Sequence, residues 1–409
     1  MSFLRLLSVL LLGLSSLAAP VMAAKKIRVD LTYDVRFQPE AGYADVAMIV
    51  EKGEMVVSFD LNLGKRGDYS EFKGNGEISQ NGDRLLWKPS PGVAKLTYRV
   101  NLTHPRDNGK FDALMTPDWA LFRGDDLIPA GDLVQQDDVL LVSRLQFQLP
   151  KGWNSVETGW PLVGKQLFRI DNPSQMFDRP TGWIVAGKIG SRRDQLGDAN
   201  VSVVAPVGEG MRRMDILTML TFVWPHAAEA FQRQPKKLLV VGANDPMWRG
   251  GLSAPNSFYM HADRPVVSEN GTSSLVHELV HVFTRIRDTD NSDWISEGIA
   301  EFYAIELVRR AGGMSEYRYK AVRSKLQKWS KGVKTLGGSS STGAQTARAV
   351  LLLQDLDLEI RKQTDNQRSL DDVTRGLMRM EQVSTKDLIE ICESILGKQS
   401  AVLDTKLLQ

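Results

Sequence analysis

The residues with the clearest chemical potential lie near position 280, where His277 and His281 flank Glu278 in the pattern His-Glu-x-x-His. Two histidines four positions apart share one face of an α-helix, so both rings can bind one metal ion. Glu278 lies beside the first histidine, where its carboxylate can take a proton from a metal-bound water. Glu297 supplies a third ligand and leaves a fourth position open for water. The pattern predicts a site for one Zn²⁺ ion that activates water for hydrolysis.

Two helices are predicted to position these side chains. The first spans residues 272–287, with Thr272 or Ser273 as its cap after a helix-breaking Asn-Gly pair. Apolar residues recur at helical spacing along it, which predicts a buried stripe beside the histidines. This stripe fixes the helix against a core and thereby fixes the direction of its metal-binding face.

The second helix is predicted over residues 294–310, with Asp293 as its N-cap. Glu301 lies one turn beyond Glu297, so it can accept a hydrogen bond from a ligand histidine outside the metal's own ligand set; the alternative is a solvated helix carboxylate. Gly298 lowers the helix propensity, and a close approach between helices near the metal would explain its presence.

These residues resemble the gluzincin metallopeptidases, most closely the glycyl-aminopeptidase family. The resemblance rests on the two helical motifs, on Gly250-Gly251-Leu252 upstream, and on the segments 356–361 and 369–373 downstream, and it extends over residues 205–380. It implies a thermolysin-like catalytic domain in which His277, His281 and Glu297 bind zinc and Glu278 is the general base. It also implies that Gly250, Gly251, Leu252 and Ser253 form a strand that binds substrate.

The sequence departs from the family pattern at the substrate strand. The family continues Gly-Gly-Leu with Glu-His, and that glutamate holds the free amino group of the substrate. Here Ser253 and Ala254 follow Leu252. A neutral serine does not balance an ammonium group, so we expect weak discrimination between free and blocked N-termini.

A second departure concerns the tyrosine with which the family stabilises the oxyanion. Counting back from Asp357 places Thr346 at that position. Loss of one oxyanion donor costs on the order of 10²- to 10³-fold in rate. Tyr303, Tyr317 and Tyr319 are the alternatives for supplying a hydroxyl from another direction, and otherwise they are ordinary packing residues.

The chain as a whole predicts an α+β protein. Short alternating segments over residues 24–204 indicate a β-rich N-terminal domain, expected to be a β-sandwich. Residues 205–311 form the predicted zinc-binding catalytic domain, followed by a C-terminal helical region over 312–409. Residues 118–126 are interpreted as a loop with packed aromatics, or alternatively as a segment against the catalytic domain. Residues 257–260 are interpreted as the exposed edge strand with which a peptide would pair.

Residues 1–23 have the features of a signal peptide: Arg5, an apolar stretch of about a dozen residues, and a small-residue cleavage site. We therefore expect export, to the periplasm or outside the cell, and no membrane span in the mature chain. The lone Cys392 excludes an intramolecular disulfide. A net charge of +2 gives no electrostatic case for binding nucleic acid.

The sequence therefore favours an exported zinc peptidase, possibly an unusual aminopeptidase, whose partner is a peptide or protein substrate. A zinc-containing peptide-binding or scaffold protein of the cell envelope is the alternative, motivated by the missing amine anchor and tyrosine. Hydrolysis of another amide or an ester uses the same zinc-water chemistry and is not separated from peptidase activity by these residues.

Overall fold

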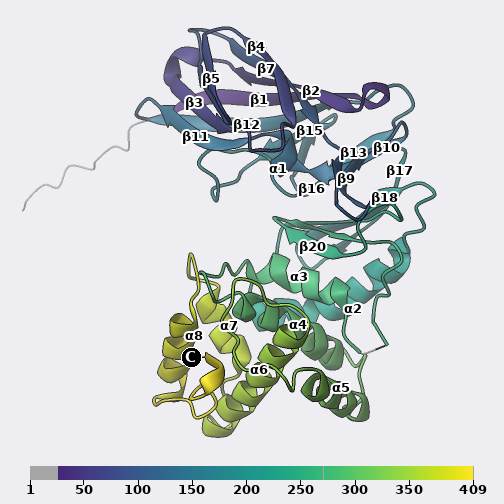
Figure 1. Cartoon of the computed structure of the whole chain (residues 1–409), viewed down its shortest axis with the longest axis vertical. Coiled ribbons are helices and arrows are strands. Elements are labelled where there is room, and N and C mark those ends of the chain that lie inside the picture. The colour runs from purple at the N-terminus through teal and green to yellow at the C-terminus, as the bar shows by residue number, and fades with distance from the viewer. Residues whose placement is uncertain (1–25, 270, 409) are drawn as a thin grey trace, which may run out of the picture.

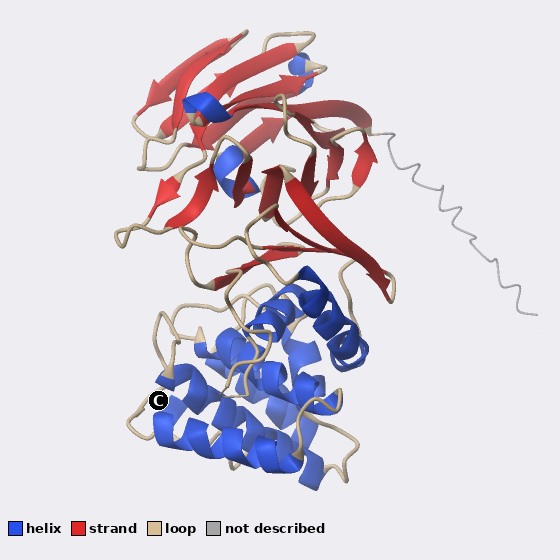
Figure 2. Cartoon of the chain, turned by 90° about the vertical axis from the view of Figure 1, so that its right-hand side faces the viewer, coloured by secondary structure: helices blue, strands red, loops and turns tan. Residues whose placement is uncertain are grey.

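The computed structural model describes residues 26–269 and 271–408, so the predicted signal peptide lies outside the described residues. The fold is α+β: three sheets form the N-terminal half, a fourth sheet follows, and helices make up most of the C-terminal half (Figure 1). Figure 2 shows the strands gathered at one end of the molecule and the helices at the other. None of the described helices combines the length and apolar character needed to cross a membrane.

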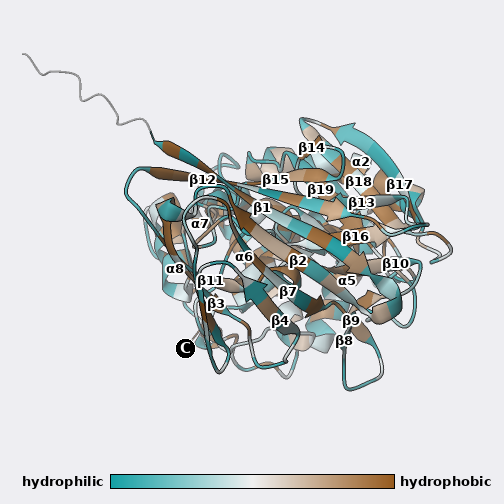
Figure 3. Cartoon of the chain, turned by 90° about the horizontal axis from the view of Figure 1, so that it is seen from above, coloured by the Kyte–Doolittle hydropathy of each residue, from teal (hydrophilic) through white to brown (hydrophobic). Residues whose placement is uncertain are grey.

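The N-terminal half is built from strands that bury alternate side chains. Along β1 (Ile27–Gln38), Val29, Leu31, Tyr33 and Val35 are buried while the residues between them are more exposed. The same alternation of hydropathy is visible along β1 and β2 in Figure 3. The short strands expected within residues 24–204 are present and include Ile27–Gln38, Tyr43–Val50, Val56–Asn62, Arg84–Lys88 and Ala94–Asn101.

Sixteen of the described strands form the three N-terminal sheets. The first sheet has the order β14 (Leu162–Gly164), β15 (Leu167–Ile170), β12 (Val139–Gln148), β1, β2 (Tyr43–Val50), β7 (Ala94–Asn101), β4 (Tyr69–Gly74). The second has the order β13 (Ser155–Thr158), β16 (Trp183–Gly187), β10 (Trp119–Arg123), β9 (Phe111–Met115), β8 (His104–Pro105). The third has the order β11 (Ala130–Gln135), β3 (Val56–Asn62), β6 (Arg84–Lys88), β5 (Glu77–Asn81).

The fourth sheet positions the site. Its order is β17 (Ile189–Leu196), β18 (Ala199–Pro206), β19 (Lys237–Val241), β21 (Ser257–Met260), β20 (Gly251–Ala254). Strands β18, β19 and β21 are parallel, whereas β20 runs antiparallel to β21 at one edge. The predicted domain boundary at 204/205 falls inside β18, so this sheet begins earlier in the chain than that boundary. The domain division itself stays a prediction.

Both faces of the fourth sheet are covered, which joins the two halves of the molecule. Leu238 and Val240 of β19 belong to the large core formed with the helices. Leu239 and Val241, on the opposite face, pack in a smaller core with Trp119 of β10 and residues of β16. The interpretation of residues 118–126 as a loop is therefore wrong: they form β10 and the short helix α1 (Gly124–Leu127), and the strand lies against the site-bearing sheet. The sequence reasoning gave too little weight to its buried aromatic residues.

The helical half consists of α2 (Arg213–Phe231), α3 (Ser274–Thr284), α4 (Trp294–Arg310), α5 (Glu316–Trp329), α6 (Ala344–Gln363), α7 (Leu370–Leu377) and α8 (Thr385–Leu396). The predicted helix over 294–310 agrees with α4, whereas α3 stops at Thr284 rather than continuing to residue 287. Arg285 adopts a left-handed conformation at φ 52° and caps the helix through its backbone N–H to His281 O. Within the helical core, a Cβ on Gly298 would lie 2.8 Å from Ala349 Cβ, so glycine permits the close contact of α4 with α6.

Candidate metal centre and substrate cleft

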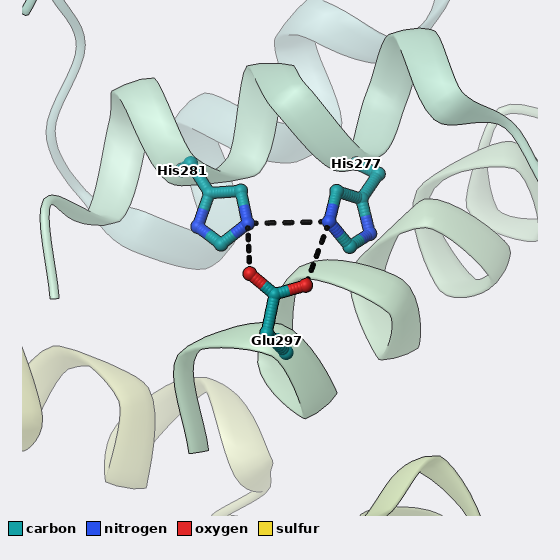
Figure 4. Close-up of side chains that lie close together, drawn as sticks. All are labelled: His277, His281 and Glu297. Atoms are coloured by element: carbon teal, nitrogen blue, oxygen red, sulfur yellow. Dashed lines mark hydrogen bonds and ion pairs between the residues drawn. The ribbon is translucent and has the colours of Figure 1, made fainter. Parts of the chain in front are cut away.

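His277 and His281 on α3 and Glu297 on α4 meet at one point (Figure 4). The two Nε2 atoms lie 3.2 Å apart, and they lie 3.4 Å and 3.3 Å from the two carboxylate oxygens of Glu297. A tetrahedral zinc with bonds of about 2.0–2.2 Å places its ligands roughly 3.3–3.6 Å apart. The spacing and the N/O donor set therefore fit a zinc ion. They form the only group with metal-ligand geometry among residues 26–269 and 271–408.

Local structure accounts for how these side chains converge. Ser273 caps α3 by accepting a hydrogen bond from the N–H of Val276, as one of the two predicted caps. Asp293 occupies the N-cap position of α4 but makes no hydrogen bond to its own helix; its carboxylate accepts from Ser341 N instead. That contact ties the start of α4 to the loop before α6, which forms the opposite side of the cleft.

Glu301 lies where the sequence reasoning expected a supporting acceptor. His277 donates from Nδ1 to Glu301 Oε2 at 3.0 Å, which directs the Nε2 lone pair of the ring toward the other two ligands. Burial favours the neutral imidazole, but hydrogen bonds to Glu297 and Glu301 outweigh it and raise the pKa of His277 to about 10.

Glu278 is buried and faces the edge strand of the fourth sheet. A Cβ on Gly251 would lie 2.8 Å from Glu278 Oε1, so the strand approaches the carboxylate as closely as glycine allows. Burial raises the pKa of Glu278, against the opposing effects of the two histidines and of a backbone hydrogen bond from Ser253. A raised pKa suits a group that takes a proton from water and passes it on.

The edge strand is β20, not residues 257–260 as predicted. Strand β21 is buried between β19 and β20, and all four of its residues are inaccessible. The error arises because both segments are short and apolar, and only the sheet order shows which of them lies outermost. Of the four residues expected to bind substrate, Gly251, Leu252 and Ser253 lie in β20, and Gly250 directly precedes it.

Two cavities flank the metal centre. The larger, of about 950 Å³, contains Gly250, Gly251, His277, Glu278 and Glu297, and extends to α5 and the start of α6. The smaller, of about 340 Å³, contains Ser253, Ala254 and His281. Strand β20 contributes Gly251 to the larger cavity and Ser253 and Ala254 to the smaller one, and we name the two cavities together the cleft.

No tyrosine is among the described residues that line either cavity. Thr346, which sequence counting placed at the oxyanion position, does line the larger cavity, and its hydroxyl donates to Ser341 O at 3.1 Å. Tyr303 is buried with its hydroxyl bonded to Asp371, Tyr317 is exposed, and Tyr319 packs beneath Arg309. None of these three tyrosines replaces the missing phenol.

The sequence reasoning missed the basic residues that line the cleft. Arg264 lies in the larger cavity and bonds to Arg249 O and Ser274 Oγ. Arg285 and Arg287 lie in the smaller one. The only available signal was the position of the last two, directly after the metal-binding helix, and it does not show which way they point.

The chain matches no known protein-family model, and no curated protein matches it in sequence. Solved structures do match over almost the whole chain. An aminopeptidase N family protein from Idiomarina loihiensis has a TM-score of 0.66 at 16% identity, covering 91% of this chain and 76% of that one. An M1 zinc metallopeptidase from Deinococcus radiodurans, in a glutamate-to-alanine variant bound to the substrate Tyr-Ser-Ala, has a TM-score of 0.58 at 16% identity, covering 93% of each. The chain has the M1 metallopeptidase fold.

The leukotriene A4 hydrolase of Saccharomyces cerevisiae shares this fold as well, with a TM-score of 0.54 at 13% identity, covering 93% of this chain and 66% of that one. The predicted relationship to the gluzincins is thus confirmed at the level of the fold. The M1 fold also covers the N-terminal half, over which the sequence resemblance did not extend. The narrower assignment to the glycyl-aminopeptidase family stays a prediction.

Proposed function

We propose that the protein is a zinc-dependent peptidase with an M1-like, thermolysin-like catalytic region. The proposal rests on two features that lie side by side. His277, His281 and Glu297 have the spacing of a zinc site, and the buried Glu278 lies between them and the edge strand β20. The structural neighbours, which include an M1 zinc metallopeptidase bound to the substrate Tyr-Ser-Ala, support it.

The residues have distinct roles in this proposal. His277, His281 and Glu297 hold the ion, and Glu301 fixes the ring of His277. A bound zinc lowers the pKa of water and polarises a carbonyl. Glu278 accepts the proton of the attacking water and delivers it to the leaving amine. The free edge of β20 pairs with an extended peptide and places its scissile bond beside Glu278.

The substitution Glu278→Gln tests the function directly. The variant keeps the shape of the side chain but removes the base, so we expect full zinc content and a loss of turnover of about 10²- to 10⁴-fold. Zinc-loaded wild type and variant would be incubated with a mixed peptide library and the products read by mass. Cleavage at equal rates in both proteins would refute the mechanism, and the cut positions in the wild type would separate end-trimming from internal cutting.

A zinc-containing peptide-binding protein of the cell envelope is the second candidate. The specific observation in its favour is that Thr346, rather than a tyrosine, faces the larger cavity. Against it, a binder has no use for a buried carboxylate with a raised pKa beside the metal cluster. Zinc and peptide binding without cleavage by wild type would favour this candidate or a non-peptide substrate.

Export remains part of the proposal. It rests on residues 1–23 alone, and the mature chain is expected to begin near Ala24. The intact mass of the protein from its native source tests it, since a mass that includes residues 1–23 would exclude cleavage.

A further inference from the structure

The smaller cavity joins the end of the metal-binding helix to the tip of the β20–β21 hairpin. One wall carries His281, Arg285 and Arg287, and another carries residues 253–256 of the hairpin. Trp160 and residues 171–174 of the N-terminal half close it from the third side. Because His281 and Ser253 belong to this cavity, a peptide that pairs with β20 at the metal centre continues into it.

Two arginines give this cavity its charge. Arg285 donates from Nη2 to Asn256 Oδ1 at 2.6 Å, which holds its guanidinium across the end of the hairpin. Arg287 has no side-chain partner among the described residues, and neither arginine forms an ion pair with a described carboxylate. Asp171 is the one carboxylate that lines the cavity. Two positive charges therefore face one negative charge, and most of the guanidinium N–H donors are left for a ligand.

Residues around the smaller cavity add to its excess of positive charge. Arg285 and Arg287 are both exposed, and partial desolvation together with the nearby positive charges of Arg233 and Arg287 lowers the pKa of Arg285. A protein does not gain stability by gathering unpaired arginines, since each like-charge contact opposes the compact state. An anion bound between them relieves the repulsion and accepts charge-assisted hydrogen bonds, for which the planar guanidinium is well suited.

We propose that Arg285 and Arg287 form a carboxylate-binding subsite, so that the cleft selects acidic peptides. This inference rests on the proposed peptide-binding function of the cleft. The subsite would also explain why Ser253 replaces the amine-binding glutamate of the resembled family. In the smaller cavity, two arginines would repel a free ammonium group and attract a carboxylate. The carboxylate comes either from a Glu or Asp side chain or from the C-terminus of the peptide.

Binding measured in the zinc-loaded Glu278→Gln background tests the subsite without turnover. Fluorescent peptides that differ only by Glu or Gln at successive positions would be titrated by anisotropy, each with a free and an amidated C-terminus. We expect about tenfold tighter binding of the Glu peptide at one position, weakening as salt rises. A comparable loss of affinity on amidation alone identifies the carboxylate as the chain terminus, and a loss on Glu→Gln alone identifies it as the side chain.

The double substitution Arg285→Gln/Arg287→Gln should abolish this preference. Arg192→Gln should leave it intact, because Arg192 is an exposed residue of β17, at the edge of the fourth sheet opposite β20. An unchanged Tm of the double variant shows that it folds. A preference that survives in the double variant, or a wild type whose affinity changes with neither Glu→Gln nor amidation, overturns the subsite.

The two proposals can fail separately. Cleavage by wild type with no acidic preference in binding overturns the subsite and leaves the peptidase. Arginine-dependent binding of acidic peptides without cleavage by zinc-loaded wild type supports the subsite and overturns the peptidase. Neither binding nor cleavage overturns both.

Discussion

The two sides of the cleft differ in how far they keep the features of a metallopeptidase. On the helical side, α3 and α4 bring together three side chains with metal-ligand spacing, Glu301 bonds to one of them, and Glu278 is buried beside them. On the other side, β20 carries Ser253 where the resembled family has an amine anchor, and the start of α6 carries Thr346 where it has a tyrosine. Under the proposed function, this difference means that the water-activating residues are kept while substrate recognition and oxyanion stabilisation have changed.

The strongest test of this comparison is a substitution where the two sides of the cleft touch, at the contact between Gly251 and Glu278. In Gly251→Ala, the new Cβ meets Glu278 Oε1 at 2.8 Å, so either the base or the edge strand must shift. A misplacement of about 1 Å near the reacting atoms costs roughly 10²-fold in rate. We therefore expect kcat/KM to fall by about a hundredfold, with zinc content unchanged.

The matched control for that variant is Ser253→Ala, in the same strand, which adds no atoms and keeps the backbone N–H that faces Glu278. It should retain activity within a few-fold. If Gly251→Ala were as active as Ser253→Ala, the close contact between the strand and the base would have no catalytic importance, and the two sides of the cleft would be independent.

A second test sharpens the account of the helical side. Glu301→Ala removes the acceptor for His277 Nδ1, so the ring loses its fixed orientation. Loss of such a partner typically lowers metal affinity by about 10- to 100-fold. Zinc affinity would be measured by competition with a chromogenic chelator. Glu301→Gln, which keeps an acceptor oxygen, should lose less; equal affinities in all three proteins would mean that Glu301 is only a solvated helix carboxylate.

The same two sides show what the sequence can and cannot predict. His277 and His281 were expected on one face because helical spacing is a local property: four residues along one helix fix which side chains share a face. Glu297 lies on a second helix and was added from the second motif, and the structure brings it to the two histidines. The edge strand was misplaced because the outermost position of β20 depends on pairings made by residues far away in the chain. Arg285 and Arg287 were overlooked as cleft residues for a related reason, since their direction is set by the left-handed turn that ends α3 and by the distant Asn256.

The smallest expected effect concerns the start of α6, where Thr346 lines the larger cavity in place of a tyrosine. Thr346→Tyr would place a phenol in the larger cavity, near the metal centre and beside the loop that Asp293 holds. Since an oxyanion donor is worth on the order of 10²- to 10³-fold in its best geometry, a donor in an unrefined position should raise kcat by about tenfold. Thr346→Phe supplies the same ring without the hydroxyl and should give no gain. A gain in kcat shared by both variants would be a packing effect. A gain in the tyrosine variant alone would show that the missing oxyanion donor, and not the metal centre, limits the rate.

If kcat rises in neither variant, oxyanion stabilisation already comes from another group in the cleft. Arg264 would then be the first residue to substitute, because it lines the same cavity without a carboxylate partner among the described residues.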